Sequence, residues 1–293
     1  MKLYQRIRDI DRRVIFLFIA LSVIFPLLFK ISFPEYASPI VQRIFDKVES
    51  LPVGSKVLLS FDYDPPSAPE LHPMATAYVR HCCERNLKMY IIALWPMGQT
   101  MANQIIQEVI ETEFPQKIYG VDYLNLGFKS GGQGVINLIL SDFEQAYPVD
   151  INGTSIDQIE MMKGIKNLQN MNLILNISAG FPGLKEWVLF GGDPGQIPVA
   201  GGVTAVSAPL LYPYYPQQLL GLMGGMKGAA EYEAALIKRY PHYAKREHLG
   251  IFRMGPQAVA HMVIIFFIIV GNITFFIGRH HEKREATGKE VAK

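Results

Sequence analysis

A stretch near the carboxyl-terminal end limits the fold of this chain more than any other feature of the sequence. Residues 255–278 read GPQAVAHMVIIFFIIVGNITFFIG and contain no Asp, Glu, Lys or Arg. A helix of this length spans the roughly 30 Å hydrocarbon core of a bilayer, so the run predicts a transmembrane helix. His261 lies near one end of the run, which places it in the headgroup region; the alternative is a functional histidine inside the membrane.

A second apolar stretch lies near the amino terminus. Residues 14–29 read VIFLFIALSVIFPLLF, and extension through Lys30 gives a span over residues 14–33, about 20 residues long. Pro26 would kink such a helix without preventing it. The alternative is a cleaved signal peptide, but residues 31–34 (ISFP) form a poor cleavage site. We therefore predict a retained transmembrane helix.

Basic residues on both tails predict the orientation. Residues 1–13 and residues 279–293 are both basic tails, and Lys and Arg next to a span favour the cytoplasmic side. Three basic residues before the second span (Lys245, Arg246 and Arg253) compete weakly with this assignment. The sequence thus predicts an inner- or plasma-membrane protein with both termini in the cytoplasm and residues 34–254 as a single extracytoplasmic domain.

The segment between the two apolar stretches alternates between strand-like and helix-like patterns. Short apolar runs predict strands at residues 56–61, 89–95, 121–126, 172–177 and 199–207, and helical spacing predicts helices at 38–50, 71–86, 101–114, 134–143 and 216–240. Continuous apolar strands that alternate with helices are typical of a parallel sheet covered on both faces. The predicted fold class is α/β, with a mostly parallel, doubly wound sheet of the flavodoxin or Rossmann type.

Ligands of such a sheet bind beyond the carboxyl ends of the strands, so the loops there supply the candidate binding residues. Asp62 and Asp64 follow the first strand and could bind a cation or do acid–base chemistry. The competing interpretation is that they form a turn and cap the next helix. The loop is too short of further ligands to predict a metal site.

The loop after the third strand is rich in glycine. Lys129, Ser130, Gly131 and Gly132 lead into a helix, and their backbone N–H groups suit a phosphate or another anion. The loop matches neither a Walker A sequence nor a dinucleotide-binding glycine motif. A tight strand-to-helix turn explains its glycines equally well.

Glycines and tyrosines in residues 209–230 supply the candidate interface residues. Four glycines in one predicted helix, each costing about 1 kcal/mol relative to alanine, imply close approach of another backbone, in this domain or a neighbouring subunit. Alternatively, a loop lies at residues 224–225 and the helix begins near Met226, so that Lys227 and the exposed N–H groups face a site. The tyrosine- and proline-rich loop before them is either packed or exposed to a partner. The candidates are Gly221, Gly224, Gly225, Gly228, Tyr212, Tyr214 and Tyr215.

Charge and cysteine content exclude several classes of protein. The net charge of +2 is too small to indicate a nucleic-acid partner. Cys82 and Cys83 are adjacent and are the only cysteines, so a disulfide framework and a thiolate zinc site are excluded. Ser130, Ser178 and Ser207 follow strands, but no histidine is placed as their partner. The sequence predicts no cofactor and no metal.

Three functions are compatible with these features. The favoured hypothesis is a non-enzymatic subunit of a membrane assembly of the transport or secretion type, in contact with the bilayer and with other membrane subunits or further copies of itself. The second is a domain that binds or senses a ligand, including an anion, at the strand ends. The third, less favoured, is a membrane-anchored hydrolase or transferase that uses the same edge. The fold class by itself does not choose among them.

Overall fold

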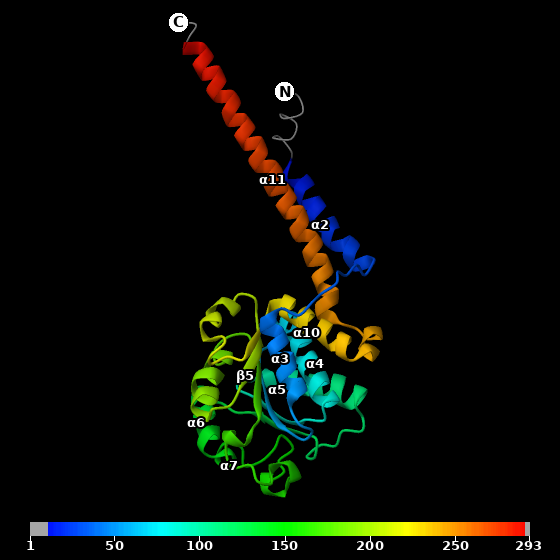
Figure 1. Ribbon diagram of the computed structural model, residues 1–293, viewed down its shortest axis with the longest axis vertical. Helices are drawn as coiled ribbons and strands as arrows, with labels where there is room; N and C mark the ends of the chain where they lie inside the picture. Colours follow the sequence, from blue (N-terminus) through cyan, green and yellow to red (C-terminus); the bar gives the residue numbers. More distant parts are fainter. Residues whose placement is uncertain (1–10, 291–293) are drawn as a thin grey trace. The chain divides into compact units, whose positions relative to one another are not determined.

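The computed structural model describes residues 11–290, with the backbone alone for residues 281–290. The chain divides into two compact units, of which one is Pro34–Ile251 and the other is formed by the segments on either side of it. The unit Pro34–Ile251, called here the α/β domain, carries a sheet with helices on both of its faces (Figure 1). The prediction of an α/β fold is confirmed.

The sheet has six strands, all parallel, in the order β3-β2-β1-β4-β5-β6. This is the order of a doubly wound Rossmann-type sheet, in which the direction of winding reverses between β1 and β4. The sequence alone did not give this order. The strands are β1 (Lys56–Asp62), β2 (Lys88–Ala93), β3 (Tyr123–Phe128), β4 (Leu173–Ser178), β5 (Val199–Val203) and β6 (Gly221–Gly224).

Each face of the sheet is covered by its own apolar core. Side chains alternate along β1, so that Leu59 packs into the first core and Leu58 into the second. The first core is covered by α3 (Pro39–Ser50), α4 (Ala68–Glu84), α5 (Gly98–Ile105) with the π-helix η1 (Ile106–Glu111), and α10 (Gly225–Arg239). The second is covered mainly by α6 (Gln133–Ser141), α7 (Phe143–Ala146), α8 (Leu184–Glu186) and the π-helix η5 (Trp187–Gly192). Burial on both faces explains why the strands read as continuous apolar runs.

Short helices complete the domain. They are α9 (Asp193–Gly195) and the 3-10 helices η2 (Ile156–Gln158), η3 (Glu160–Met162), η4 (Leu168–Asn170), η6 (Ala208–Leu210), η7 (Tyr212–Tyr214) and η8 (Pro241–Lys245).

The predicted helix over residues 216–240 is wrong in its first third. Residues 221–224 form the edge strand β6, and α10 begins at Gly225, where φ is +62°. The alternative start near Met226 was therefore nearer to the structure. A Cβ at Gly221 would overlap Ile44 of α3 and lie 2.5 Å from the carbonyl oxygen of Ile40. The glycine thus lets α3 pack directly on β6, and a strand of four residues is too short to leave a pattern in the sequence.

The strand predicted over residues 199–207 is too long. β5 ends at Val203, and the chain then turns, so Val206 lies in an exposed loop rather than in a strand. The remaining predicted helices and strands are present, with ends shifted by up to three residues.

Apolar helices form the second unit. α11 runs from Leu249 to Glu290, and its residues Leu249–His280 are long and apolar enough to cross a membrane. α2 (Arg12–Leu28) has 17 residues and is about 25 Å long, which is shorter than the span predicted over residues 14–33. The chain leaves the helix there, because Lys30 has a φ of +50°. Within this unit the rings of Phe18 and Phe267 lie 6.0 Å apart, so the two helices contact each other.

Candidate functional site

β1 and β4 are neighbours at the point where the winding of the sheet reverses, which is where Rossmann-type sheets place their ligands. Asp62 ends β1 and Ser178 ends β4, and the two residues are paired in register across the sheet. Chain segments that follow these strands therefore meet at one edge, called here the carboxyl edge. The candidate site is built from the loops of this edge.

Asp62 lies inside the protein rather than at the surface of this edge. Its Oδ1 accepts a hydrogen bond of 2.6 Å from the N–H of Leu94, and its Oδ2 accepts bonds from Asn176 Nδ2 (2.6 Å), Ser60 Oγ (2.7 Å) and Trp187 Nε1 (3.2 Å). Burial raises the pKa of Asp62 to about 6 in spite of these donors. The carboxylate ties β1, the end of β2, β4 and η5 together, which is a structural role.

Asp64 does not join Asp62. Its Oδ1 accepts hydrogen bonds from the N–H of Ser67 at 3.2 Å and from the Ser67 hydroxyl at 2.5 Å. These contacts form the turn before α4, as the competing interpretation predicted for Asp64, although the N-cap residue of the helix is Ser67. The two carboxylates therefore make separate contacts, one within the sheet and one within the turn before α4.

The glycine-rich loop after β3 is a tight turn into α6. Gly131 and Gly132 have φ angles of +131° and +52°, a region that glycine adopts readily. The N–H of Lys129 donates to the carbonyl of Ala93 at 3.0 Å, and Ser130 is exposed. A Cβ at Gly132 would lie 3.5 Å from Pro182, so this loop packs beside the loop after β4.

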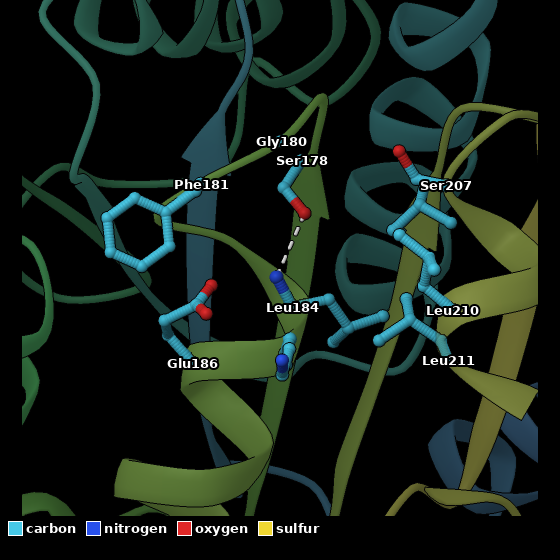
Figure 2. Close-up of a pocket in the computed structure, with 10 residues that line it drawn as sticks. Ser178, Gly180, Phe181, Leu184, Glu186, Ser207, Leu210 and Leu211 are labelled. Carbon is cyan, nitrogen blue, oxygen red and sulfur yellow. Dashed lines mark hydrogen bonds between the residues drawn. The ribbon is translucent and has the colours of Figure 1, made fainter. Parts of the chain in front are cut away.

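A pocket opens one strand beyond the winding reversal, between the ends of β4 and β5. Its volume is about 290 Å³, at the lower end of the range for small-molecule sites. Figure 2 shows the side chains that surround it. The pocket is lined by Ser178, Gly180, Phe181, Leu184, Lys185, Glu186, Val203, Ser207, Leu210 and Leu211.

Four polar side chains line this β4–β5 pocket among apolar ones: the exposed Lys185 and three that are hydrogen-bonded, Ser178, Glu186 and Ser207. Ser178 is 2% exposed, and its Oγ accepts a hydrogen bond of 3.0 Å from the N–H of Leu184. Glu186 is 7% exposed, and its Oε2 accepts a hydrogen bond of 2.8 Å from the N–H of Gly183. Ser207 Oγ accepts from the hydroxyl of Thr204 at 3.0 Å. The pocket therefore combines aliphatic walls with a buried carboxylate and two hydroxyls.

The loop that forms one side of the pocket is fixed by close packing. A Cβ at Gly183 would overlap the carbonyl oxygen of Gly180 and the side chain of Ser178, so only glycine fits there. A hydrogen bond of 2.7 Å from Trp95 Nε1 to the carbonyl of Pro182 also fixes this loop. The pocket thus has a rigid wall.

Large exposed apolar side chains lie in the loops that follow β4 and β5, the two strands whose ends border the pocket. Phe181 after β4 is 73% exposed, and Val206 and Leu210 after β5 are 85% and 70% exposed. Phe181 and Leu210 also line the pocket itself. Tyr212, which the sequence analysis named as an interface candidate, lies further along the chain segment that follows β5 and is 55% exposed. We call these four residues the apolar rim.

The other interface candidates pack inside the domain. Tyr215 lies beside Arg43 of α3, whose Cζ is 5.5 Å from the ring centroid, and Tyr214 packs partly against the second core. A Cβ at Gly228 would lie 2.7 Å from the backbone of Met223, and Cβ atoms at Gly224 and Gly225 would lie within 3 Å of Ala208, Ala205 and Glu70. The glycines therefore serve close packing within this domain, as the first sequence alternative expected, although Gly221 and Gly224 lie in β6 and not in the helix that this alternative assumed.

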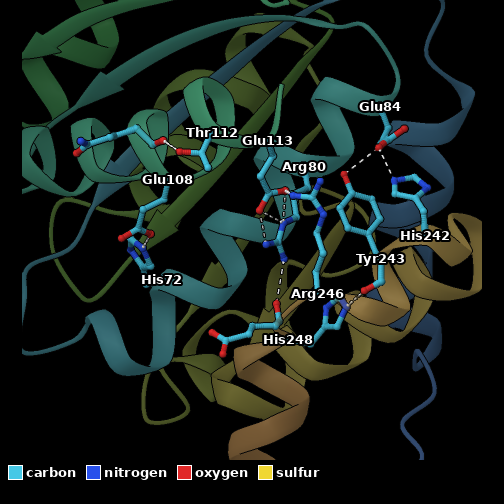
Figure 3. Close-up of polar contacts among 12 residues, drawn as sticks. His72, Arg80, Glu84, Glu108, Thr112, Glu113, His242, Tyr243, Arg246 and His248 are labelled. Atoms are coloured by element: carbon cyan, nitrogen blue, oxygen red, sulfur yellow. Dashed lines mark hydrogen bonds and ion pairs between the residues drawn. The ribbon is translucent and has the colours of Figure 1, made fainter. Parts of the chain in front are cut away.

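A second polar cluster lies where the domain leads into α11 (Figure 3). Arg80 of α4 donates to both carboxylate oxygens of Glu113, at 3.0 and 2.6 Å, and Arg246 reaches the same carboxylate at 2.7 Å. The ring of Tyr243 lies 5.6 and 5.7 Å from the two guanidinium carbons, and its hydroxyl donates to Glu84 at 2.9 Å. The cluster fixes η8 to α4.

Sequence reasoning missed Glu186 and placed Val206 in a strand. Phe181 and Leu210 lie in loops that it had named, but it did not single them out as site residues. Ser178 and Ser207 had been recognised as residues that follow strands, and that position was the available signal for the pocket. Comparison of the chain with models of known protein families and with curated proteins finds no match. The proposed function therefore depends on the residues and geometry of the site itself.

Proposed function

We propose that this protein is a membrane-anchored, non-enzymatic subunit of a membrane assembly, and that its α/β domain contacts a partner subunit through the apolar rim. The observation that carries the proposal is the exposure of Phe181, Val206, Leu210 and Tyr212 on neighbouring loops. A group of large apolar side chains at one site is costly in water and is typical of an interaction surface.

The arrangement of the domain's own ends supports attachment by two helices. Glu231 of α10 accepts a hydrogen bond of 2.9 Å from the N–H of Ser38, near the beginning of the domain. Glu233, on the same helix, accepts bonds from the N–H groups of Gly250 and Ile251 at its end. Both ends of the domain are thus held by α10, as expected if α2 and α11 both enter one membrane.

Side-chain exposure and charge support the same topology. Phe16 and Leu28 of α2 are as exposed as the apolar residues of α11, and such surfaces are stable in lipid. Both tails are basic, which favours the cytoplasm for both termini and the opposite side for the domain.

An enzymatic role has less support from the pocket. None of the residues that line it is a histidine, and neither Ser178 nor Ser207 is hydrogen-bonded to the carboxylate there, Glu186. A nucleophilic hydroxyl requires an adjacent base to activate it. The earlier ligand-site candidates do not converge either, because Asp62 is buried in the sheet and Asp64 forms a turn.

Photo-crosslinking on the full chain in its native membrane tests the proposal. A photoreactive amino acid replaces Val206 or Leu210 in the rim, and Val53 or Ile118 in control variants. The controls are large exposed apolar residues that precede β1 and β3, at the opposite edge of the sheet. We expect adducts with one membrane protein, or with a second copy of this chain, from the rim positions alone.

Serine substitutions provide the second measurement. Val206→Ser combined with Leu210→Ser should release the crosslinked partner during extraction in mild detergent, whereas Val53→Ser with Ile118→Ser should retain it. Equal crosslinking from both edges, or a chain that runs as a lone monomer in every mild detergent, would contradict the proposal.

A further inference from the structure

The β4–β5 pocket contains a buried carboxylate with unused hydrogen-bonding capacity. Glu186 uses Oε2 to accept the bond from Gly183, whereas Oε1 has no hydrogen-bond partner among the described residues. Figure 2 shows this carboxylate directed toward the space beside Ser178 and Phe181. The hydrogen bond from Gly183 accounts for Oε2, and Oε1 remains available to a ligand.

A second buried polar group at the pocket, the hydroxyl of Ser178, also has unused hydrogen-bonding capacity. The Ser178 hydroxyl accepts a bond from Leu184 but donates to no acceptor within the described part of the chain. A hydroxyl can donate one hydrogen bond and accept two. Two side chains that are more than nine-tenths buried therefore present polar atoms to one small cavity.

The charge of the site is set by Glu186 rather than by its neighbour Lys185. Lys185 also lines the pocket, but it is exposed, and a long lysine side chain can keep its ammonium in water. Glu186 is 7% exposed and its Oε2 is bonded to the N–H of Gly183, which keeps its carboxylate at the pocket. A buried carboxylate is best satisfied by a positively charged donor.

The remaining walls select for an apolar body. Leu184, Leu211 and Val203 are buried at the pocket, and Leu210 and Phe181 complete its sides. A volume of about 290 Å³ limits the ligand to a compact molecule.

We propose that the β4–β5 pocket binds a small organic ammonium ion, whose charged nitrogen donates to Glu186 and whose short branched aliphatic part packs against the leucines. The hydroxyls of Ser178 and Ser207 offer further hydrogen bonds along the walls. This site shares Phe181 and Leu210 with the apolar rim, but its ligand is a small molecule, and binding to the purified chain requires no partner.

Both tryptophans of the chain report on this site. Trp95 bonds to the loop that forms the wall, and Trp187 follows Glu186 directly. Titration of the purified full chain, in a detergent with an uncharged headgroup, can therefore be followed by intrinsic fluorescence and by calorimetry. The probes are isoamylamine, isovalerate and isoamyl alcohol, which share an aliphatic part and differ in charge.

We expect isoamylamine to bind and to change the tryptophan emission, and isovalerate and isoamyl alcohol to bind far more weakly. Glu186→Gln keeps an oxygen that can accept from Gly183 but removes the charge, and it should weaken amine binding by roughly tenfold to hundredfold. Glu144→Gln, on the exposed side of α7, is the matched control and should bind as the wild type does.

Leu210→Lys gives an independent test that does not threaten the fold, because Leu210 is largely exposed. An ammonium placed at the mouth should repel the amine and reduce its affinity. The proposal is overturned if the wild type binds the three probes equally or does not bind the amine at all. It is also overturned if Glu186→Gln and Leu210→Lys both bind the amine with wild-type affinity. None of these results depends on whether a partner subunit crosslinks to the rim.

Discussion

The indole N–H of Trp187 donates a hydrogen bond of 3.2 Å to the carboxylate of Asp62, which connects the π-helix beside the pocket to the centre of the sheet. Trp187 is fully buried, and so is Asp62. The bond links two layers of the fold at the edge where the winding reverses. Asp62 therefore acts as a structural link, and substitutions of it should be read first as changes in stability.

Asp62→Asn should destabilise the protein and remove a pH dependence. An amide nitrogen in place of Oδ2 cannot accept the hydrogen bonds that Asn176, Ser60 and Trp187 donate there. The expected cost is about 1–3 kcal/mol in the free energy of unfolding. Burial raises the pKa of Asp62 to about 6, above its ordinary value of 3.8. This group therefore stabilises the folded state below about pH 4, and that contribution, about 3 kcal/mol, is lost as the pH rises through about 6.

Thermal unfolding of the full chain in mild detergent between about pH 4 and pH 7 checks this prediction. Asp64→Asn is the matched control, since Asp64 lies in a partly exposed turn. The assignment of Asp62 fails if the wild type and Asp62→Asn show the same pH slope.

Glu113→Gln should destabilise the domain by about 3 kcal/mol, because it leaves the buried guanidinium of Arg80 without its carboxylate. Both side chains of this ion pair are 9% exposed. Glu111→Gln, two residues earlier and exposed, should change the stability by less than about 0.5 kcal/mol. Denaturant unfolding followed by circular dichroism measures both, and similar values for the two variants would show that the cluster contributes little.

Gly221→Val and Gly134→Ala should have opposite effects. A side chain at Gly221 would collide with Ile44 and with the backbone of α3, at a cost of about 1–3 kcal/mol. Gly134 lies in α6 with no atom near its missing Cβ, so alanine there should stabilise the protein by about 0.5–1 kcal/mol. Melting temperatures of the two variants check both signs, and a neutral Gly221→Val would contradict the packing of α3 on β6.

Labelling of single engineered cysteines should place the domain and the tails on opposite sides of the membrane. In sealed cells, a membrane-impermeant maleimide should modify Val53→Cys, whereas Gln5→Cys and Ala292→Cys should react only after permeabilisation. The native Cys82 and Cys83 should stay silent because both are buried, and burial raises the pKa of Cys82 to about 12. Labelling of the two tails on different sides would rule out the proposed topology.

The positions of most strands and helices were predictable because buried strands and helices each have a local pattern of apolar residues in the sequence. β1, β2 and β4 are short apolar runs, and α3 and α6 carry helical spacing. No such pattern predicts β6, because it has only four residues and two of them are glycines. These glycines allow α3 and the loop after β5 to pack closely against the strand. Val206 was misassigned for a related reason: an apolar residue next to a strand looks buried until the turn that exposes it is known.

The sequence by itself determined the two apolar helices, the alternation of strand and helix, and the edge of the sheet where a site could form, because each depends on residues close together in the chain. Only the tertiary structure decided the strand order and the separate roles of Asp62 and Asp64. It also placed Ser178, Glu186 and Ser207 around one cavity beneath an exposed apolar rim. These properties depend on contacts between segments distant in sequence, whose pairing no local pattern encodes.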